Sequence, residues 1–280
     1  MRSKKCVLAG AAGYIAPKHF EAIRQNGGEV LAVIDPVDHL DVLDNYFPDA
    51  EYFRSLDEAK SFLSDRRIDY FVICSPSHLH AKQICFALEM GCDVVCESPV
   101  VLSPEELDQV KEAEQAFQKK VFTILQYRYD PAIRQLKQHF RPENQYKIEL
   151  VNNSFRGKWL AKSWKGDEMK TGGILTVLGY HFFDALMWIY GSAQKVEFRE
   201  KTAQKAAGSA ELDHAQVDFA FSNADSTKTE KNILQLVVGK QAINLSHHDQ
   251  ELYNQVYRDI FAGNGIELKD VEPTIRFYSS

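Results

Sequence analysis

The strongest constraint on the fold is an alternation of short apolar runs with helix-period segments along the first 125 residues. Apolar runs of strand length stand at 7–9, 30–34, 70–74, 93–96 and 121–125. Because a strand–helix–strand connection in one sheet is almost always right-handed, each strand returns in parallel beside an earlier one. The first part of the chain therefore predicts a doubly wound parallel sheet.

The pattern changes after residue 126. A helix is expected near 131–140, and strand-like runs follow at 146–152, 195–200, 215–221, 233–238 and 242–245. Consecutive strands with polar spacers, among them the hairpin-like segment 223–231, favour a mostly antiparallel sheet on which the apolar helix 173–190 packs. We therefore expect an α/β protein with two domains, 1–125 and 126–280.

The charge balance and the cysteines limit the classes of partner and compartment. Lys and Arg number 33 against 39 Asp and Glu, a net charge of -6, and no basic face is large enough to bind nucleic acid. Five cysteines form no C-x-x-C pair, which favours reduced thiols. The first residues run straight into a strand without a signal-peptide pattern, so we expect a cytoplasmic protein.

The segment 173–191 approaches the length of a membrane span. It carries His181 and Asp184 near its middle, and an ionisable pair at that position argues against lipid contact. We therefore expect no membrane partner.

A glycine turn joins the first strand to the first helix, where a dinucleotide-binding turn belongs. Gly10 and Gly13 let the backbone approach a pyrophosphate, whose charge meets the N-terminus of the helix. The two glycines are three residues apart instead of two, and Ala16 stands at the third small position, so an ordinary tight turn is the alternative.

An acidic residue ends the second strand. The carboxylate of Asp35 can accept hydrogen bonds from a ribose 2′-hydroxyl and would repel a 2′-phosphate, which favours NAD over NADP. The alternative is a cap of the turn before Pro36. After the next strand, Ser75, Pro76 and His80 suit a loop beside a nicotinamide ribose, although they are also ordinary helix-cap chemistry, and His80 could instead be a packing residue.

Four motifs resemble, in order and spacing, the Gfo/Idh/MocA oxidoreductase family. They are the glycine turn, Cys74-Ser-Pro-Ser-His-Leu-His80, Cys96-Glu-Ser-Pro99 and Gly179-Tyr-His-Phe-Phe-Asp184. The segments 10–19, 124–128, 156–159 and 162–167 are similar to one branch of it, the UDP-N-acetyl-glucosaminuronate 3-dehydrogenases of surface-polysaccharide biosynthesis. The likeness covers most of the chain and weakens between 192 and 250.

The resemblance implies a Rossmann domain followed by an α/β domain with an open sheet. It also implies hydride transfer from carbon 3 of a nucleotide sugar to NAD, by a homo-oligomer that is a dimer or a tetramer. The cofactor-binding residues then expected are Gly10, Ala12, Gly13, Tyr14, Ile15, Asp35, Ser75, Pro76, His80, Glu97 and Gln126.

Two positions depart from the family pattern. One is Pro273, which stands inside the last helix that the resemblance implies and disfavours its continuation. At the other, where relatives carry Glu-Lys-Pro, this chain has Glu97, Ser98 and Pro99. A helix that starts at Ser103 places Ser98 in the loop beyond the carboxyl end of a strand, the edge where open α/β sheets bind ligands. Serine carries no charge and is a poor acid at neutral pH, so Ser98 cannot inherit the role of the lysine.

Proton transfer during alcohol oxidation needs a base, and histidine suits this work near neutral pH. His181 and Asp184 are three residues apart on the expected helix and share one face, so Asp184 could orient the imidazole. The alternative is a buried His–Asp pair that stabilises packing. Asp184 could also bind a sugar hydroxyl. With the resemblance we predict His181, Asp184 and Ser98 as the catalytic set. Three outcomes follow from Ser98: a slower dehydrogenase that rests on His181, a different reaction with another proton donor such as Tyr127 or Tyr180, or a chain that binds without turnover.

A basic segment suggests where the substrate binds. The segment 154–170 contains five basic and only two acidic residues, with tryptophans between them. Such a segment suits a diphosphate and a carboxylate, and its alternative is a solvated loop. The predicted substrate-binding residues are Arg128, Arg156, Lys162, Trp164 and Tyr180.

No group of His, Cys and Asp residues in the sequence has the spacing of metal ligands. The adjacent pair His247 and His248 would point to opposite faces of a strand, so a joint site is not expected. We therefore expect catalysis without a metal. A second hypothesis stays open: the chain is a paralogue that binds nucleotide without turnover and serves an active homologue as partner or regulator.

Overall fold

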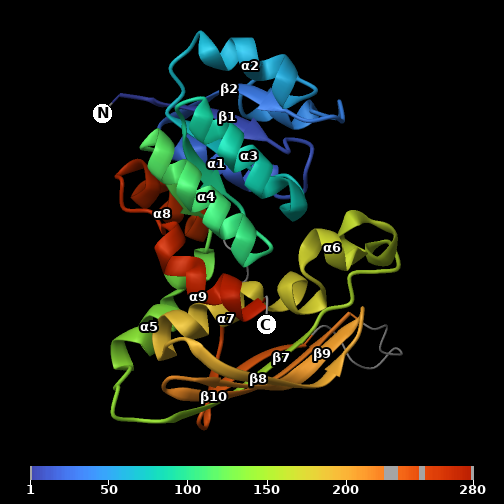
Figure 1. Cartoon of the computed structure of the whole chain (residues 1–280), viewed down its shortest axis with the longest axis vertical. Helices are drawn as coiled ribbons and strands as arrows, with labels where there is room; N and C mark the ends of the chain where they lie inside the picture. The colour runs from blue at the N-terminus through green and yellow to red at the C-terminus, as the bar shows by residue number, and fades with distance from the viewer. Residues whose placement is uncertain (1, 224–232, 246–249, 279–280) are drawn as a thin grey trace. The chain divides into compact units, whose positions relative to one another are not determined.

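The computed structural model of the chain describes residues 2–223, 233–245 and 250–278 (Figure 1). Its contacts divide the chain into two compact units. The first unit holds residues 1–126 and 248–269, and the second holds 127–247 and 270–280. The first unit thus includes a late segment that the expected boundary at 125 assigned to the other domain. His247, His248 and most of the expected loop at 223–231 lie outside the described residues.

The first unit is built on a six-stranded sheet in the order β3-β2-β1-β4-β5-β6, with every pairing parallel. This is the strand order of dinucleotide-binding doubly wound sheets. Its strands are β1 (Lys4–Ala9), β2 (Gly28–Ile34), β3 (Glu51–Phe53), β4 (Tyr70–Ile73), β5 (Asp93–Cys96) and β6 (Val121–Thr123). The fold predicted from the alternation is confirmed.

Helices flank this sheet. They are α1 (Ala16–Gln25), α2 (Leu56–Ser64), α3 (His80–Glu89), α4 (Pro104–Phe117) and α8 (Gln250–Phe261). In Figure 1 α3 lies beside α4, and α1 packs against α8. The hydroxyl of Ser103 accepts a hydrogen bond from the N–H of Glu106 and caps α4, as the Ser-Pro-Glu-Glu pattern predicts. This cap fixes the end of the loop that contains Ser98.

The second unit contains a mixed sheet in the order β12-β11-β7-β10-β9-β8, in which only the described β7–β10 pairing is parallel. Its strands are β7 (Tyr146–Asn153), β8 (Ala193–Lys201), β9 (Lys205–Leu212), β10 (Ala215–Ser222), β11 (Ile233–Val238) and β12 (Gln241–Ile243). Along β10 buried and more exposed residues alternate, so one face of the sheet carries the core. The expected mostly antiparallel sheet is confirmed.

The long helix α7 (Ile174–Tyr190) covers the apolar face of this sheet (Figure 1). The stretch Glu168–Tyr190 is long and apolar enough to cross a membrane, yet 72% of its apolar window is buried inside the protein. Such burial is typical of the core helix of a globular protein. The remaining helices are α5 (Pro131–His139), α6 (Glu168–Thr171) and α9 (Leu268–Tyr278).

Several elements were not placed by the sequence prediction, among them β9 and α8. Strand β9 has the sequence KAAGSAEL, which lacks the β-branched and aromatic residues typical of strands. Its small residues fit beneath larger neighbours, since a Cβ at Gly208 would lie 3.0 Å from the ring of Phe219. Helix α8 was not anticipated, and α9 continues through Pro273, which was expected to disfavour a helix there.

Candidate active site

The glycine turn lies directly against the end of β4. Gly10 has a φ of +88°, and a Cβ there would come 2.5 Å from the nitrogen of Ser75. The N–H of Gly10 donates to the carbonyl of Ile34, and that of Gly13 donates to the carbonyl of Gly10. Only glycine combines this conformation with this close approach, so the first position of the motif is fixed by sterics.

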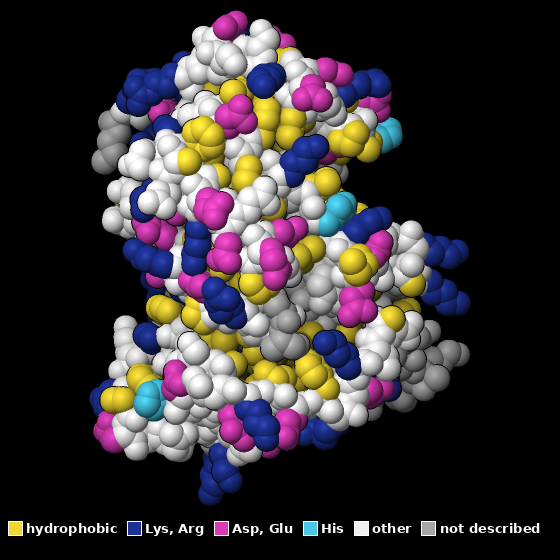
Figure 2. All heavy atoms as spheres, in the orientation of Figure 1, with side chains coloured by type: hydrophobic (Ala, Val, Ile, Leu, Met, Phe, Trp, Pro, Cys, Tyr) yellow, Lys and Arg dark blue, Asp and Glu magenta, His cyan; other side chains and the backbone are white. Residues whose placement is uncertain are grey.

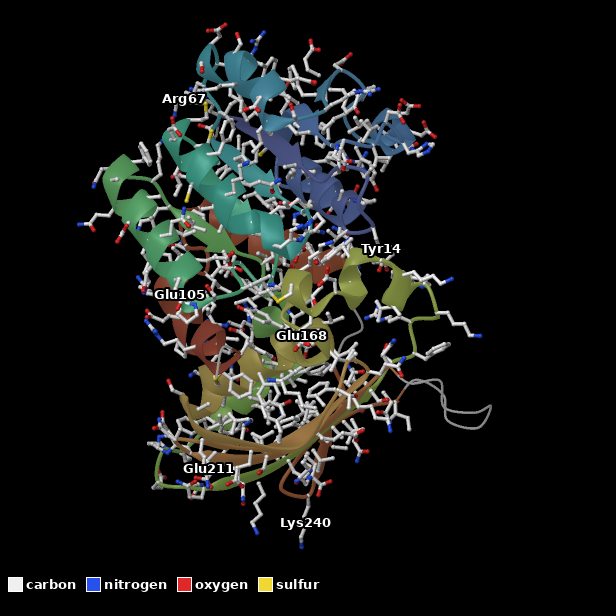
Figure 3. The ribbon with its side chains drawn as sticks, turned by 45° about the vertical axis from the view of Figure 1, so that its right-hand side comes forward. Tyr14, Arg67, Glu105, Glu168, Glu211 and Lys240 are labelled. Carbon is white, nitrogen blue, oxygen red and sulfur yellow. The ribbon has the colours of Figure 1, made fainter. Side chains whose placement is uncertain are left out.

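Helix α1 begins just after this turn at Ala16, and no side chain caps its N-terminus. The N–H groups of Ala16 and Lys18 donate to the carbonyls of Gly13 and Ile15, so the start of the helix offers a phosphate the positive end of its dipole. Beside them Tyr14, labelled in Figure 3, is 83% exposed. Gly13, Tyr14 and Ile15 thus form the open side of the turn.

Asp35 links the end of β2 to the same turn. Its carboxylate is 6% exposed and accepts hydrogen bonds from the N–H of Ala12 at 3.0 Å and of Val37 at 2.9 Å. The cap expected as the alternative is therefore present, because the bond to Val37 closes the turn around Pro36. Each carboxylate oxygen keeps a further lone pair for a ribose hydroxyl.

The loops after β4 and β5 are joined by a buried histidine. The ring nitrogens of His80 lie 2.8 Å from the carbonyl oxygens of Pro99 and Ser75. Burial lowers the pKa of His80 below its usual 6.5, and the two carbonyls together with Glu97 oppose that shift. His80 therefore fixes the loop that carries Ser75 and Pro76.

The hydroxyl of Ser98 forms its hydrogen bond within the protein. Its hydroxyl donates to the carbonyl of Ile124, and Thr123 Oγ1 lies 3.5 Å away. A hydroxyl has one proton to give, so Ser98 ties the loop after β5 to the segment after β6. Nearby in the sequence, Gln126 is 2% exposed, and its buried Oε1 has no hydrogen-bond partner among the described residues.

In the second unit His181 lies on α7 among aromatic rings. The centroid of its ring is 5.5 Å from that of Tyr127 and 6.2 Å from that of Tyr180. Burial raises the pKa of Tyr127 to about 12; nearby Asp130 adds to the shift and Arg156 opposes it. Tyr127 thus keeps its proton at neutral pH and can act as a hydrogen-bond donor.

Asp184 forms a buried ion pair with Arg128. Arg128 Nε and Nη2 donate to the two carboxylate oxygens at 2.8 and 2.7 Å, and Nη2 also donates to the carbonyl of Asp270. Thr274 Oγ1 donates to the same carboxylate. The Arg128 guanidinium and the Asp184 carboxylate together join the segment before α5 to α7 and α9. The sequence did not reveal this structural role. The assignment of Arg128 to substrate and of Asp184 to catalysis stays a prediction.

The basic segment between β7 and α7 is open to solvent. Figure 2 shows Lys and Arg side chains projecting there, in the region labelled α6 in Figure 1. Arg156 and Lys162 are exposed, Trp159 is 53% exposed, and the backbone N–H of Arg156 donates to Asn223. Trp164 is partly buried under the ammonium group of Lys165. The exposed cations of the basic segment are accessible to an anionic ligand.

The structure thus brings the predicted residues together in two sets. The first unit gathers Gly10, Ala12, Asp35, Ser75, His80 and Ser98 with their neighbours at the carboxyl edge of its sheet. The second gathers His181, Tyr180 and Arg156 around Tyr127. A buried partner of Glu97, His19, was missed, because its tyrosine neighbours lie on the unanticipated α8. Among the described residues no three metal-ligating side chains form a group.

Family models match both units. One described as "Oxidoreductase family, NAD-binding Rossmann fold" matches residues 4–125, and one described as "Oxidoreductase family, C-terminal alpha/beta domain" matches 144–257. The chain belongs to the Gfo/Idh/MocA oxidoreductase family.

Two solved structures resemble this family member over nearly their whole length. The WlbA (WbpB) dehydrogenase from Thermus thermophilus in complex with NAD and alpha-ketoglutarate is 36% identical, with 99% of this chain and 94% of that chain covered and a TM-score of 0.94. The same enzyme with NAD and UDP-GlcNAcA has a TM-score of 0.93 at the same identity and coverage.

Curated relatives are more distant. D-glucoside 3-dehydrogenase of Escherichia coli (strain K12) is 24% identical over 54% of this chain and 46% of its own length. The scyllo-inositol 2-dehydrogenase (NADP(+)) IolW of Bacillus subtilis (strain 168) is 26% identical over 64% of this chain and 54% of its own. The chain therefore spans about half the length of these curated relatives.

The described residues fit NAD, as expected from the sequence. The start of α1 and the Asp35 carboxylate suit a pyrophosphate and a ribose. The unpaired Oε1 of Gln126 could accept a hydrogen bond from a carboxamide. The first unit is thus an NAD-binding Rossmann domain.

The buried Arg128–Asp184 pair predicts a large effect on stability. Asp184→Asn should lower the free energy of unfolding in urea by roughly 3–5 kcal/mol, because it leaves a buried guanidinium without its counter-ion. Asp218→Asn is the matched control, since Arg199 binds Asp218 with the same fork on an exposed surface. Equal losses in the two variants would contradict the structural role of Asp184.

The lowered pKa of His80 predicts acid sensitivity. Its folded-state pKa lies below the unfolded value near 6.5, so the unfolded chain binds the proton more readily and stability falls as the pH drops below that value. His80→Gln should therefore show a shallower loss of melting temperature than the wild type between about pH 6.5 and 5. His139→Gln, a change at an exposed histidine of α5, should keep the wild-type slope.

Proposed function

We propose that the protein is a cytoplasmic, NAD-dependent dehydrogenase of a nucleotide sugar. The substrate would resemble UDP-N-acetyl-glucosaminuronate, oxidised at carbon 3 in surface-polysaccharide biosynthesis by a homo-oligomer, either a dimer or a tetramer. The observation that carries this proposal is the likeness, at 36% identity and a TM-score of 0.93, to a dehydrogenase that holds NAD and UDP-GlcNAcA. The cofactor-fitting edge of the first sheet supports it.

The cofactor residues have distinct tasks in this proposal. Gly10 lets the turn pack on the end of β4, the start of α1 binds the pyrophosphate, and the carboxylate of Asp35 accepts hydrogen bonds from the ribose hydroxyls. NAD, when bound, accepts the hydride. Ser75, Pro76, His80 and Glu97 shape the edge beside it, with Ser98 tying the loop to the strand next to it.

The second unit supplies the groups for the sugar. His181 takes the proton of the hydroxyl that is oxidised, and the protonated Tyr127 donates a hydrogen bond beside it. Arg156 and Lys162 bind the diphosphate and the carboxylate, while Trp164 and Tyr180 offer flat apolar surfaces to the rings.

The structure also gives an argument for the alternative, a nucleotide-binding paralogue without turnover. Ser98 brings no cation to the position of the family lysine, and its only proton is donated to Ile124. Loss of one such preorganised charge costs about a hundredfold to a thousandfold in rate. The two functions differ in turnover and not in cofactor binding.

Turnover tests the proposed function. Purified protein given NAD and UDP-N-acetyl-glucosaminuronate should form NADH over many cycles, and His181→Asn should lower kcat by about a hundredfold or more, because a general base is lost. His139→Asn, at an exposed site, serves as the control. NAD binding without NADH formation by the wild type would favour the paralogue.

Restoring the lysine tests the site itself. Ser98→Lys should raise kcat by about a hundredfold, since it returns a cation to the reacting oxygen. Ser98→Met has similar length without charge and should give no gain. No difference between these two variants would contradict the placement of residue 98 beside the reacting atoms.

A further inference from the structure

The carboxylate of Glu97 is held from inside the first unit. Its Oε1 accepts hydrogen bonds from His19 Nε2 at 2.8 Å and from the hydroxyl of Tyr253 at 3.0 Å. Its Oε2 lies 3.1 Å from the N–H of Ser98, which donates to it. Three donors from α1, α8 and the loop after β5 therefore converge on one carboxylate.

A second tyrosine binds the other nitrogen of the histidine ring. The hydroxyl of Tyr257 lies 2.7 Å from His19 Nδ1, and burial raises the pKa of Tyr257 well above its usual range. The carboxylate of Glu97 can only accept, so Nε2 carries the proton of the neutral ring, and Nδ1 accepts a hydrogen bond from the hydroxyl of Tyr257. The chain of donors runs from Tyr257 through His19 to Glu97.

This chain of donors reaches the surface only at its end. His19 and Tyr257 are fully buried and Tyr253 is 2% exposed, whereas the side chain of Glu97 is 12% exposed. Apolar side chains of similar size would join α1 to α8 without the desolvation cost of buried polar groups. The arrangement therefore serves the orientation of the carboxylate at the edge of the sheet.

We propose that His19, with its Nδ1 bonded to Tyr257, is a positioning residue that orients Glu97 for binding of NAD. The inference rests on the proposed contact between Glu97 and the cofactor. It links α1, which starts at the glycine turn, to the loop after β5, so both sides of the cofactor edge are held by one hydrogen-bonded group.

Calorimetric titration with NAD tests the inference. His19→Leu should raise the Kd of NAD about tenfold to a hundredfold, because the carboxylate loses a charge-assisted hydrogen bond, and His19→Gln should recover much of the affinity through its amide N–H. Tyr70→Phe is the matched control: it removes another buried hydroxyl that bonds to α8, at Ile260, and should lower the melting temperature without a change in Kd.

A double-mutant cycle separates positioning from stability. Once Glu97→Gln has weakened NAD binding, His19→Leu should weaken it little further, although both changes still lower the melting temperature. Additive losses in affinity, or a lower melting temperature of His19→Leu with unchanged Kd, would overturn the inference. Failure of turnover with intact NAD binding would remove the proposed function and leave the inference standing.

The histidine ring itself gives a readout that needs no cofactor. In protein labelled with nitrogen-15 histidine, the NMR signals of His19 should show a protonated Nε2 and a hydrogen-bonded Nδ1, and Tyr257→Phe should move the Nδ1 signal toward that of an acceptor nitrogen without a donor. This variant keeps the buried ring, so it tests the inference even where His19→Leu does not fold. A wild-type His19 protonated on Nδ1 would overturn the proposed order of donors.

Discussion

The contact between the glycine turn and the end of β4 decides the architecture of the first unit. Gly10 meets the Cys74–Ser75 peptide so closely that no side chain fits, and this approach follows from parallel pairing of β1 with β4. Loops from neighbouring strands therefore meet at one edge, where Asp35 reaches back to Ala12 and His80 joins two loops. The predicted cofactor-binding residues are therefore concentrated at the carboxyl edge of this sheet.

Much of the first unit could be predicted because its signals are local. Buried parallel strands are continuous apolar runs, and the Gly10 turn and the Ser103 cap are defined by neighbours in the sequence. The second sheet was predicted except for β9, whose small residues are suited to packing beneath rings such as Phe219 and not to a strand pattern. Tertiary packing outweighed propensity there, as it did for Pro273 inside α9.

The partners within the candidate site could not be predicted in the same way. The spacing of His181 and Asp184 on one helix face could be read from the sequence, whereas the bond of Asp184 to Arg128, 56 positions earlier, could not. His19 and Tyr257 are 238 positions apart and meet only because α8 packs on α1. A sequence pattern names residue types at a spacing, whereas the choice of partner for a carboxylate depends on which donors share its buried surroundings.

The late segment 248–269 has a consequence for dissecting the protein. It supplies the hydroxyl of Tyr257 to His19, the carbonyl of Ile260 to Tyr70, and Glu267 as a bridge partner of Phe122 at the edge of β6. A recombinant fragment that stops at residue 126 would lack these partners and would expose to water the surface that α8 covers. The minimal cofactor-binding piece is thus discontinuous in the gene, and a circularly permuted chain would isolate it better than a truncation.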